Sequence, residues 1–195
     1  MNRTTVLAAS AAAVLAASAT AETSFLLDIP SGSGTNIEWS SAAGLEAMPF
    51  SIESEHMNYR LGGFATEGVV RAWDFDTDQN ARGKIFLTAA EGYTFTSISF
   101  DLSGFKQYES EARFKVKLNG ELWKDKIWSF DGNSDLIQKD WEFDGPVTSI
   151  EIVLQNLNDN AFAGLDNINI GTVPAPGAVA LLGLAGVVGT RRRRG

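Results

Sequence analysis

The chain has 195 residues, with 16 Lys and Arg, 24 Asp and Glu, one His and no Cys, a length that fits one domain with short appendages. All acidic residues lie between Glu22 and Asp166, so residues 22–172 carry a net charge of 11 − 24 = −13. This charge disfavours a phosphate backbone, whose binding depends on Lys and Arg, and we expect no nucleic-acid partner. The lack of Cys excludes disulfides, thiolate metal sites and Cys nucleophiles.

The N-terminus has the pattern of a secretory signal peptide. Arg3 precedes an apolar run at residues 6–19, and Ala19-Thr20-Ala21 supplies a small-x-small cleavage site. The run is shorter than the roughly 20 residues that a membrane-spanning helix needs. We therefore expect a signal helix at residues 1–21 that directs the chain to the Sec translocon, with Ala19 and Ala21 at the cleavage site and cleavage after Ala21.

The C-terminus combines a proline motif, an apolar stretch and a basic end. Residues 173–190 contain no charged side chain and begin with Val173-Pro174-Ala175-Pro176-Gly177, and their length is just sufficient for a membrane span. The arginines that follow are expected to stay on the cytoplasmic side; they are Arg191, Arg192, Arg193 and Arg194. Together the two termini predict that residues 22–172 are exported while a C-terminal hydrophobic helix lies in the inner membrane.

This order of features resembles the PEP-CTERM sorting signal of exported bacterial proteins, although Ala175 stands where the name-giving pattern has Glu. In that family an exosortase of the inner membrane recognises the tail and removes it during export. The resemblance covers residues 173–195 and implies that Pro174 and Pro176 mark the recognition site. Residues 177–189, from Gly177 onward, would be the transient anchor and residues 191–194 the stop signal. The mature protein would then reside in the cell envelope or outside the cell, whereas a plain anchor that is never cut is the alternative.

Between residues 22 and 172, apolar residues alternate with period two, which is typical of half-buried strands. Phe114, Val116 and Leu118 alternate with charged residues, and Asn119-Gly120 follows, a dipeptide typical of a two-residue hairpin turn. Turns are also expected at residues 131–132 and 144–146. The pattern predicts an all-β, two-sheet β-sandwich, with strands at residues 24–29, 69–76, 84–88, 93–102, 114–118, 122–130, 150–154 and 166–170.

Residues 162–170 resemble the closing strand of jelly-roll domains in secreted bacterial proteins, including carbohydrate-binding modules. Asp166 shares parity with Ile168 and Ile170, so on a regular strand its carboxylate points inward, which is costly without a cation or several N–H donors. The resemblance implies that Asp166 helps to hold a structural calcium ion, to which Asp28 of the first strand could contribute a further oxygen ligand. Two alternatives stay open: hydrogen bonds from turn amides, and a register shifted by one residue.

Five tryptophans indicate a binding role, because sugar rings stack on exposed aromatic faces. Most should be buried, and Trp123, beside the hairpin turn, is the one expected to contact a glycan. We expect no enzyme, since the chain lacks a G-x-S-x-G motif. The main interpretation is a non-catalytic envelope or matrix protein associated with exopolysaccharide. The alternatives are a calcium-stabilised carbohydrate-binding module and a small glycan hydrolase or lyase that uses pairs such as Glu53 and Glu55.

Overall fold

A computed structural model of the chain describes residues 22–28, 37, 39–41, 48–60, 69–72, 81–105, 108–132, 136–158 and 163–175. Both predicted terminal helices lie outside these ranges. So do the cleavage residues Ala19 and Ala21, and most of the sorting signal, namely Pro176, Gly177, Arg191, Arg192, Arg193 and Arg194. Within the described ranges, no helix is long and apolar enough to cross a membrane.

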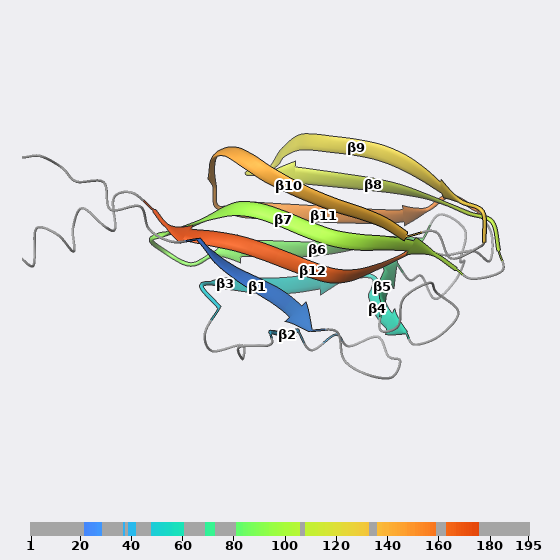
Figure 1. Cartoon of the computed structure of the whole chain (residues 1–195), viewed down its shortest axis with the longest axis horizontal. Helices are drawn as coiled ribbons and strands as arrows, with labels where there is room; N and C mark the ends of the chain where they lie inside the picture. The colour runs from blue at the N-terminus through green and yellow to red at the C-terminus, as the bar shows by residue number, and fades with distance from the viewer. Residues whose placement is uncertain are drawn as a thin grey trace, which may run out of the picture.

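Twelve strands in the described part of the chain form two antiparallel sheets that pack face to face (Figure 1). The first sheet has the order β10-β7-β12-β1-β2, with β5 paired to β12 and β4 paired to β5, and the second has the order β3-β6-β11-β8-β9. The strands are β1 (Thr23–Asp28), β2 (Ser40–Ser41), β3 (Phe50–Glu55), β4 (Met57–Arg60), β5 (Val69–Ala72), β6 (Arg82–Ala89), β7 (Tyr93–Gly104), β8 (Ser110–Leu118), β9 (Glu121–Phe130), β10 (Leu136–Val147), β11 (Ser149–Asn156) and β12 (Ala163–Pro174).

The predicted all-β sandwich of two sheets is confirmed, and each predicted strand corresponds to an observed one. The sequence did not predict β2, β3, β4 and β10. The turn predicted at residues 144–146 is wrong, because these residues belong to β10, whose register with β7 shifts between Glu142 and Val147. The predicted end of the domain at residue 172 falls inside β12, which continues to Pro174, the partner of Tyr93 on β7.

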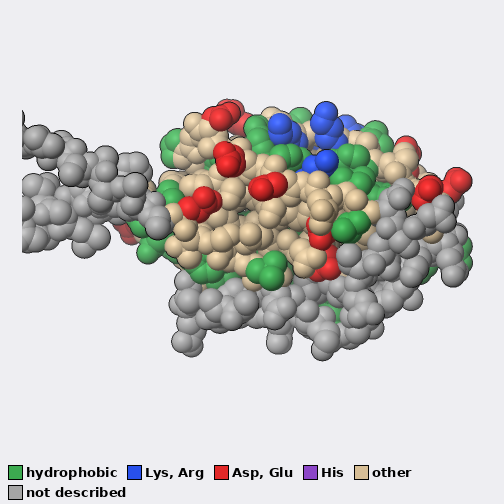
Figure 2. Space-filling view, viewed as in Figure 1, with side chains coloured by type: hydrophobic (Ala, Val, Ile, Leu, Met, Phe, Trp, Pro, Cys, Tyr) green, Lys and Arg blue, Asp and Glu red, His purple; other side chains and the backbone are tan. Residues whose placement is uncertain are grey.

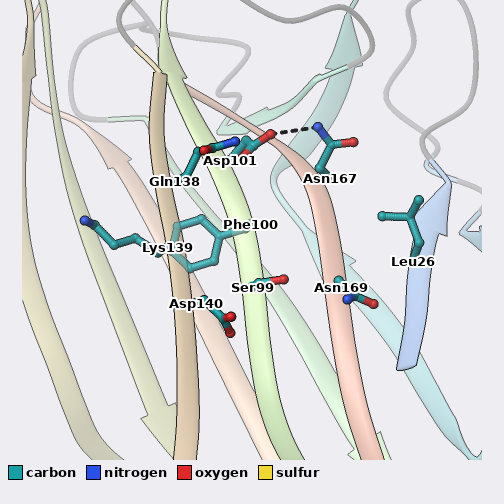
Figure 3. Close-up of a pocket in the computed structure, with 9 residues that line it drawn as sticks. All are labelled: Leu26, Ser99, Phe100, Asp101, Gln138, Lys139, Asp140, Asn167 and Asn169. Atoms are coloured by element: carbon teal, nitrogen blue, oxygen red, sulfur yellow. Dashed lines mark hydrogen bonds between the residues drawn. The ribbon is translucent and has the colours of Figure 1, made fainter. Parts of the chain in front are cut away.

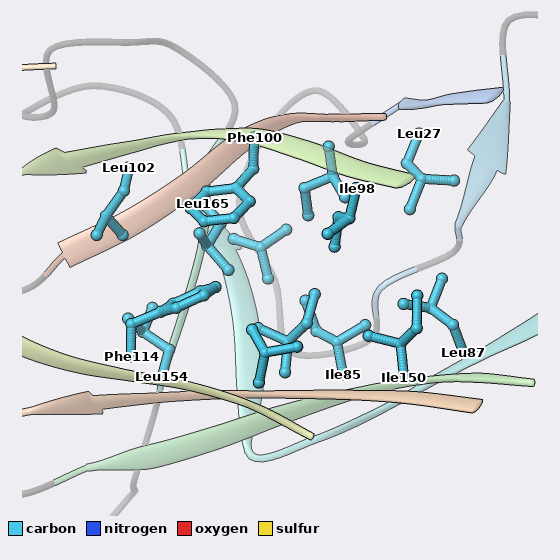
Figure 4. Packing of buried hydrophobic residues seen from close by; sticks show 14 of the residues in the cluster. Leu27, Ile85, Leu87, Ile98, Phe100, Leu102, Phe114, Ile150, Leu154 and Leu165 are labelled. Carbon is cyan, nitrogen blue, oxygen red and sulfur yellow. The ribbon is translucent and has the colours of Figure 1, made fainter. Parts of the chain in front are cut away.

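The core lies between the two sheets and consists of the apolar residues that alternate along each strand (Figure 4). Phe100 on β7 meets Phe114 on β8 across the sandwich, with ring centroids 4.7 Å apart. Burying each side chain of this size contributes about 1.5–3 kcal/mol relative to leaving it exposed. The fully buried members include Ile85, Leu87, Ile98, Leu102, Ile150, Ile152, Leu154, Leu165 and Ile168.

The first and last described strands lie side by side in the first sheet. Thr23 at the start of β1 pairs with Thr172 near the end of β12, and the pairing continues to Leu26 and Asn169. The two ends of the domain therefore meet within one sheet (Figure 1).

The Asn119–Gly120 turn between β8 and β9 is observed as predicted. Both residues have positive φ, 51° and 84°, as a type I′ hairpin turn requires. The Asn119 side chain also bonds to the β10–β11 connection: its Oδ1 accepts hydrogen bonds from the amides of Thr148 at 2.9 Å and Ser149 at 3.2 Å, and its Nδ2 donates to the Pro146 carbonyl at 3.0 Å. One side chain thus joins two turns at the same end of the sandwich.

We expect Asn119→Ala to lower the free energy of unfolding by about 2–4 kcal/mol, because it removes these hydrogen bonds and places alanine in the left-handed region. Asn119→Asp keeps the acceptor and a residue that tolerates positive φ, so its loss should be only about 0.5–1.5 kcal/mol. Urea unfolding of both variants measures the difference. Equal stability of Asn119→Ala and the wild type would contradict this role.

Candidate functional site

The outer face of the first sheet carries an open groove of about 420 Å³, here called the polar groove (Figure 3). It runs across β10, β7, β12 and β1, and six of the residues that line it have polar side chains without a positive charge: Ser99, Asp101, Gln138, Asp140, Asn167 and Asn169. Leu26, Phe100 and Lys139 complete the lining. The Lys139 side chain points away from the polar groove, so the charged groups that face it are carboxylates.

The period-two alternation of the strands places these polar side chains on one face. On β7, Ser99 and Asp101 alternate with the buried residues Ile98, Phe100 and Leu102. Because these apolar residues face the core, their neighbours along the strand face outward. On β10, Gln138 and Asp140 are exposed, while the flanking residues Ile137 and Trp141 pack against the core.

A bulge in β12 brings asparagines into the polar groove. The register of β12 with β7 shifts between Asp166 and Asn169, and Asn167 has φ 49°. As a result Leu165 and Ile168, three residues apart, are both buried. Asn167 and Asn169 consequently line the outer face.

The bulge also changes the environment predicted for Asp166. On a regular strand Asp166 would share a face with Ile168. The extra residue of the bulge instead puts Leu165 and Ile168 on the buried face and leaves Asp166 half-buried. The expectation of an inward carboxylate is therefore wrong. Asp166 Oδ1 instead accepts a hydrogen bond from the backbone amide of Asn167 at 2.7 Å, which is one of the alternatives that the sequence left open.

The calcium ion at Asp166 stays a prediction. In the described ranges, no group of three or more His, Cys, Asp or Glu is arranged to hold a metal ion. Asp28 ends β1, and its partner is Ser40 of β2 rather than a residue of β12. In the described part of the chain, β1 pairs with β12 from Thr23 to Leu26.

Two hydrogen bonds order the polar side chains of the groove. Asn167 Nδ2 donates to Asp101 Oδ2 at 2.7 Å (Figure 3), and Asp101 is only 9% exposed. Ser24 Oγ donates to Asn169 Oδ1 at 2.9 Å. A hydrogen bond to a charged group is stronger than one between neutral groups, so the Asp101–Asn167 pair fixes the centre of the polar groove.

Trp123 lies elsewhere, on β9 at the edge of the second sheet. It is half-buried and packs edge-on against Trp141 and Phe143, with centroids 5.5 Å and 5.4 Å away. The register of β9 with β8 shifts at this point, since Val116 pairs with Lys124 and the next pair is Lys117 with Leu122. Trp123 is the extra residue of this bulge. The structure does not bring Trp123 into the polar groove, and a glycan contact at Trp123 stays a prediction.

Sequence reasoning missed the residues of the polar groove. Ser99 and Asp101 lie on a strand that was predicted, and their outward parity was available from the sequence. Gln138 and Asp140 lie on β10, which was not predicted. The asparagines of β12 face the groove because of a bulge that the sequence pattern did not indicate.

Comparison with known proteins finds no matching family model and no matching curated protein. Solved structures do match. One described as "Carbohydrate binding module family29" has 9% identity and a TM-score of 0.42, and the match covers 81% of this chain and 93% of that one. Another, described as TmCBM61 in complex with beta-1,4-galactotriose, has 12% identity and a TM-score of 0.41 over 63% of this chain and 87% of that one.

A third, a family 29 carbohydrate binding module from Piromyces equi, has 17% identity and a TM-score of 0.40 over 79% of this chain and 92% of that one. Similarity at this level assigns the chain to no family.

We expect Asn167→Gly to lower the free energy of unfolding by about 1.5–3 kcal/mol, because it removes the donor to the buried Asp101 carboxylate and keeps a residue that accepts positive φ. Asn167→Ala should cost about 1–2 kcal/mol more, since alanine is strained in the left-handed region. Denaturant unfolding of the two variants separates the hydrogen bond from the backbone strain. Equal stability of Asn167→Gly and Asn167→Ala would contradict the contribution of backbone strain.

Proposed function

We propose that this chain is an exported, non-catalytic glycan-binding protein whose β-sandwich binds polysaccharide in the polar groove of β10, β7, β12 and β1. The observation that carries the proposal is the polar groove itself, which is open to solvent, has a volume of about 420 Å³ and is lined mainly by polar side chains. The proposal favours the carbohydrate-binding alternative over a purely structural matrix protein.

The chemistry of the polar groove suits sugar hydroxyls, which both donate and accept hydrogen bonds. Asn and Gln side chains offer donors and acceptors together, and carboxylates offer acceptors. Gln138 and Asp140 form no hydrogen bond with any other described side chain, so their polar atoms are available to a ligand. Leu26, 45% exposed at one side of the groove, adds an apolar contact for the C–H face of a sugar ring.

The absence of catalysis is part of the proposal. The carboxylates Glu53 and Glu55, considered above as a hydrolytic pair, lie exposed on β3 in the second sheet. Glu55 is paired with Lys84 at 3.1 Å. This pair therefore lies on a different sheet from the polar groove, where a bound glycan would be.

Export and sorting complete the proposal and rest on the terminal sequences alone. The signal peptide would direct the chain to the Sec translocon, and the PEP-CTERM-like tail would hold it in the inner membrane for an exosortase. The glycan-binding domain would then act in the cell envelope or extracellular matrix. Calcium, if it binds at Asp166, would stabilise the bulge beside the polar groove.

We expect the full chain to bind at least one member of a glycan panel that includes the producing cell's own exopolysaccharide. Gln138→Ala and Asp140→Ala should each weaken this binding, because each removes hydrogen bonds worth about 0.5–1.5 kcal/mol, or roughly two- to twelve-fold in Kd. Isothermal titration with the retained glycan measures the change.

The matched control is Gln155→Ala. It removes a side chain of the same type, but from β11 on the outer face of the second sheet. Its affinity should equal that of the wild type. Equal affinities for Gln138→Ala and Gln155→Ala would reject the polar groove as the binding site. Release of new reducing ends from the bound glycan would reject the non-catalytic part.

A further inference from the structure

The margin of the sandwich where β9 and β10 meet carries three lysines, one of which lies over a tryptophan ring. β9 ends the second sheet and β10 ends the first, and each pairs with only one other strand of the described part. Trp123 of β9 contacts Trp141 and Phe143 of β10, so the two edges face each other. We call this region the edge seam; it consists of Trp123, Trp141, Lys124, Lys126 and Lys139.

The strand register directs the lysines toward the edge seam. Lys124 lies opposite Val116 and Lys126 opposite Phe114, and both partners are fully buried. Since directly opposite residues of an antiparallel pair point to the same face, the two lysines extend from the inner face of β9. Lys139 lies on the corresponding face of β10, away from the polar groove (Figure 3). Figure 2 shows Lys and Arg side chains together with hydrophobic ones along the margin where these strands lie.

Four other basic side chains of the second sheet are neutralised by carboxylates, whereas Arg82 lies exposed at the start of β6. Lys84 pairs with Glu55, and Lys117 pairs with Glu151 at 2.9 Å.

Arg113 and Lys115 share Asp125 at 2.7 Å and 3.6 Å. The hydrogen bonds from Arg113 hold the pKa of Asp125 below its usual value, so that carboxylate is ionised at neutral pH.

The lysines of the edge seam form no ion pair with any described residue. Instead, Lys124 Nζ lies 4.3 Å from the centroid of the Trp123 ring and 6.0 Å from that of Trp141. A cation–π contact holds an ammonium group without neutralising its charge. The three positive charges therefore remain available to an anionic partner, in a domain whose net charge is −13.

From this geometry we infer that the edge seam is a second glycan site, selective for acidic polysaccharides that carry uronate carboxylates. This inference takes its class of ligand from the proposed function but uses a different surface. Lys124 and Lys126, two residues apart on one face, are about 6.6–6.8 Å apart along the strand, so their two charges lie close enough to act on one polymer chain. The half-buried tryptophan rings supply contacts for sugar C–H groups. The net negative charge of the domain disfavours duplex nucleic acid most strongly, because a duplex carries one negative charge per about 1.7 Å of its axis.

The test uses the full chain and polygalacturonate, with fully methyl-esterified polygalacturonate as the uncharged probe of the same backbone. We expect the acidic polymer to bind more tightly, and its binding to weaken as salt is raised. Lys126→Gln and Lys139→Gln should each weaken it about two- to five-fold, and the double variant more. Neither lysine makes a cation–π contact with a ring of the described residues. Unchanged near-ultraviolet circular dichroism would confirm that the tryptophan cluster is intact.

The charge-matched control is Arg82→Gln, which removes an exposed basic residue from the outer face of β6. It should bind polygalacturonate like the wild type. If all three single variants bind alike, the inference is overturned and the lysines act only to prevent edge-to-edge pairing of strands. Preference for single-stranded DNA over polygalacturonate would also overturn it.

The two glycan sites are separable in the same titrations. Loss of neutral-glycan binding in Gln138→Ala, with polygalacturonate binding retained, supports both sites. Polygalacturonate binding that depends on Gln138 but not on Lys126 overturns the edge seam and leaves the polar groove. A lysine-dependent polygalacturonate site in a chain that binds no neutral glycan supports the edge seam and rejects the polar groove.

Discussion

The pairing of β12 with β7 is the contact on which the rest of the domain depends. These two long strands form the middle of the first sheet, and β10, β1 and β5 are all attached to one or the other. Their inner residues, among them Ile98 and Ile170, are fully buried against the second sheet. Their outer residues form the floor of the polar groove. Because a strand has only two faces, the burial of one row determines the exposure of the other.

Irregularities in the strands place the side chains that distinguish this domain from a plain sandwich. The bulge at Asn167 turns two asparagines outward and provides the Asp101 contact. The bulge at Trp123 turns that ring toward β10 and closes the edge between the sheets. Bulges re-aim side chains in this way because one extra residue changes the parity of the strand.

The sequence was sufficient to predict the fold class, most strands and the Asn119–Gly120 turn, since these depend on local alternation and on turn residues that adopt positive φ. It was not sufficient for β10, because Asp144-Gly145-Pro146 is typical of a turn and here belongs to a strand. The direction of Asp166 was predicted wrongly for a related reason: parity assumes a regular strand, and the bulge at the next residue is stabilised by a contact to Asp101, which is 66 residues away along the chain. Contacts between distant segments decide such details, and no local pattern records them.

The pairing of β1 with β12 has a consequence for the order in which the domain can form. Thr23 and Thr172 come together only after the whole intervening chain is present, and closing such long-range contacts is slow compared with local folding. During synthesis, β1 therefore cannot pair with β12 until the last strand is available, and one of its edges stays unpaired until then. An edge of this kind invites pairing with other chains. In the export that we propose, folding would be completed only when the residues next to the C-terminal tail emerge, and the proposed membrane anchor would hold the chain in place for that last pairing.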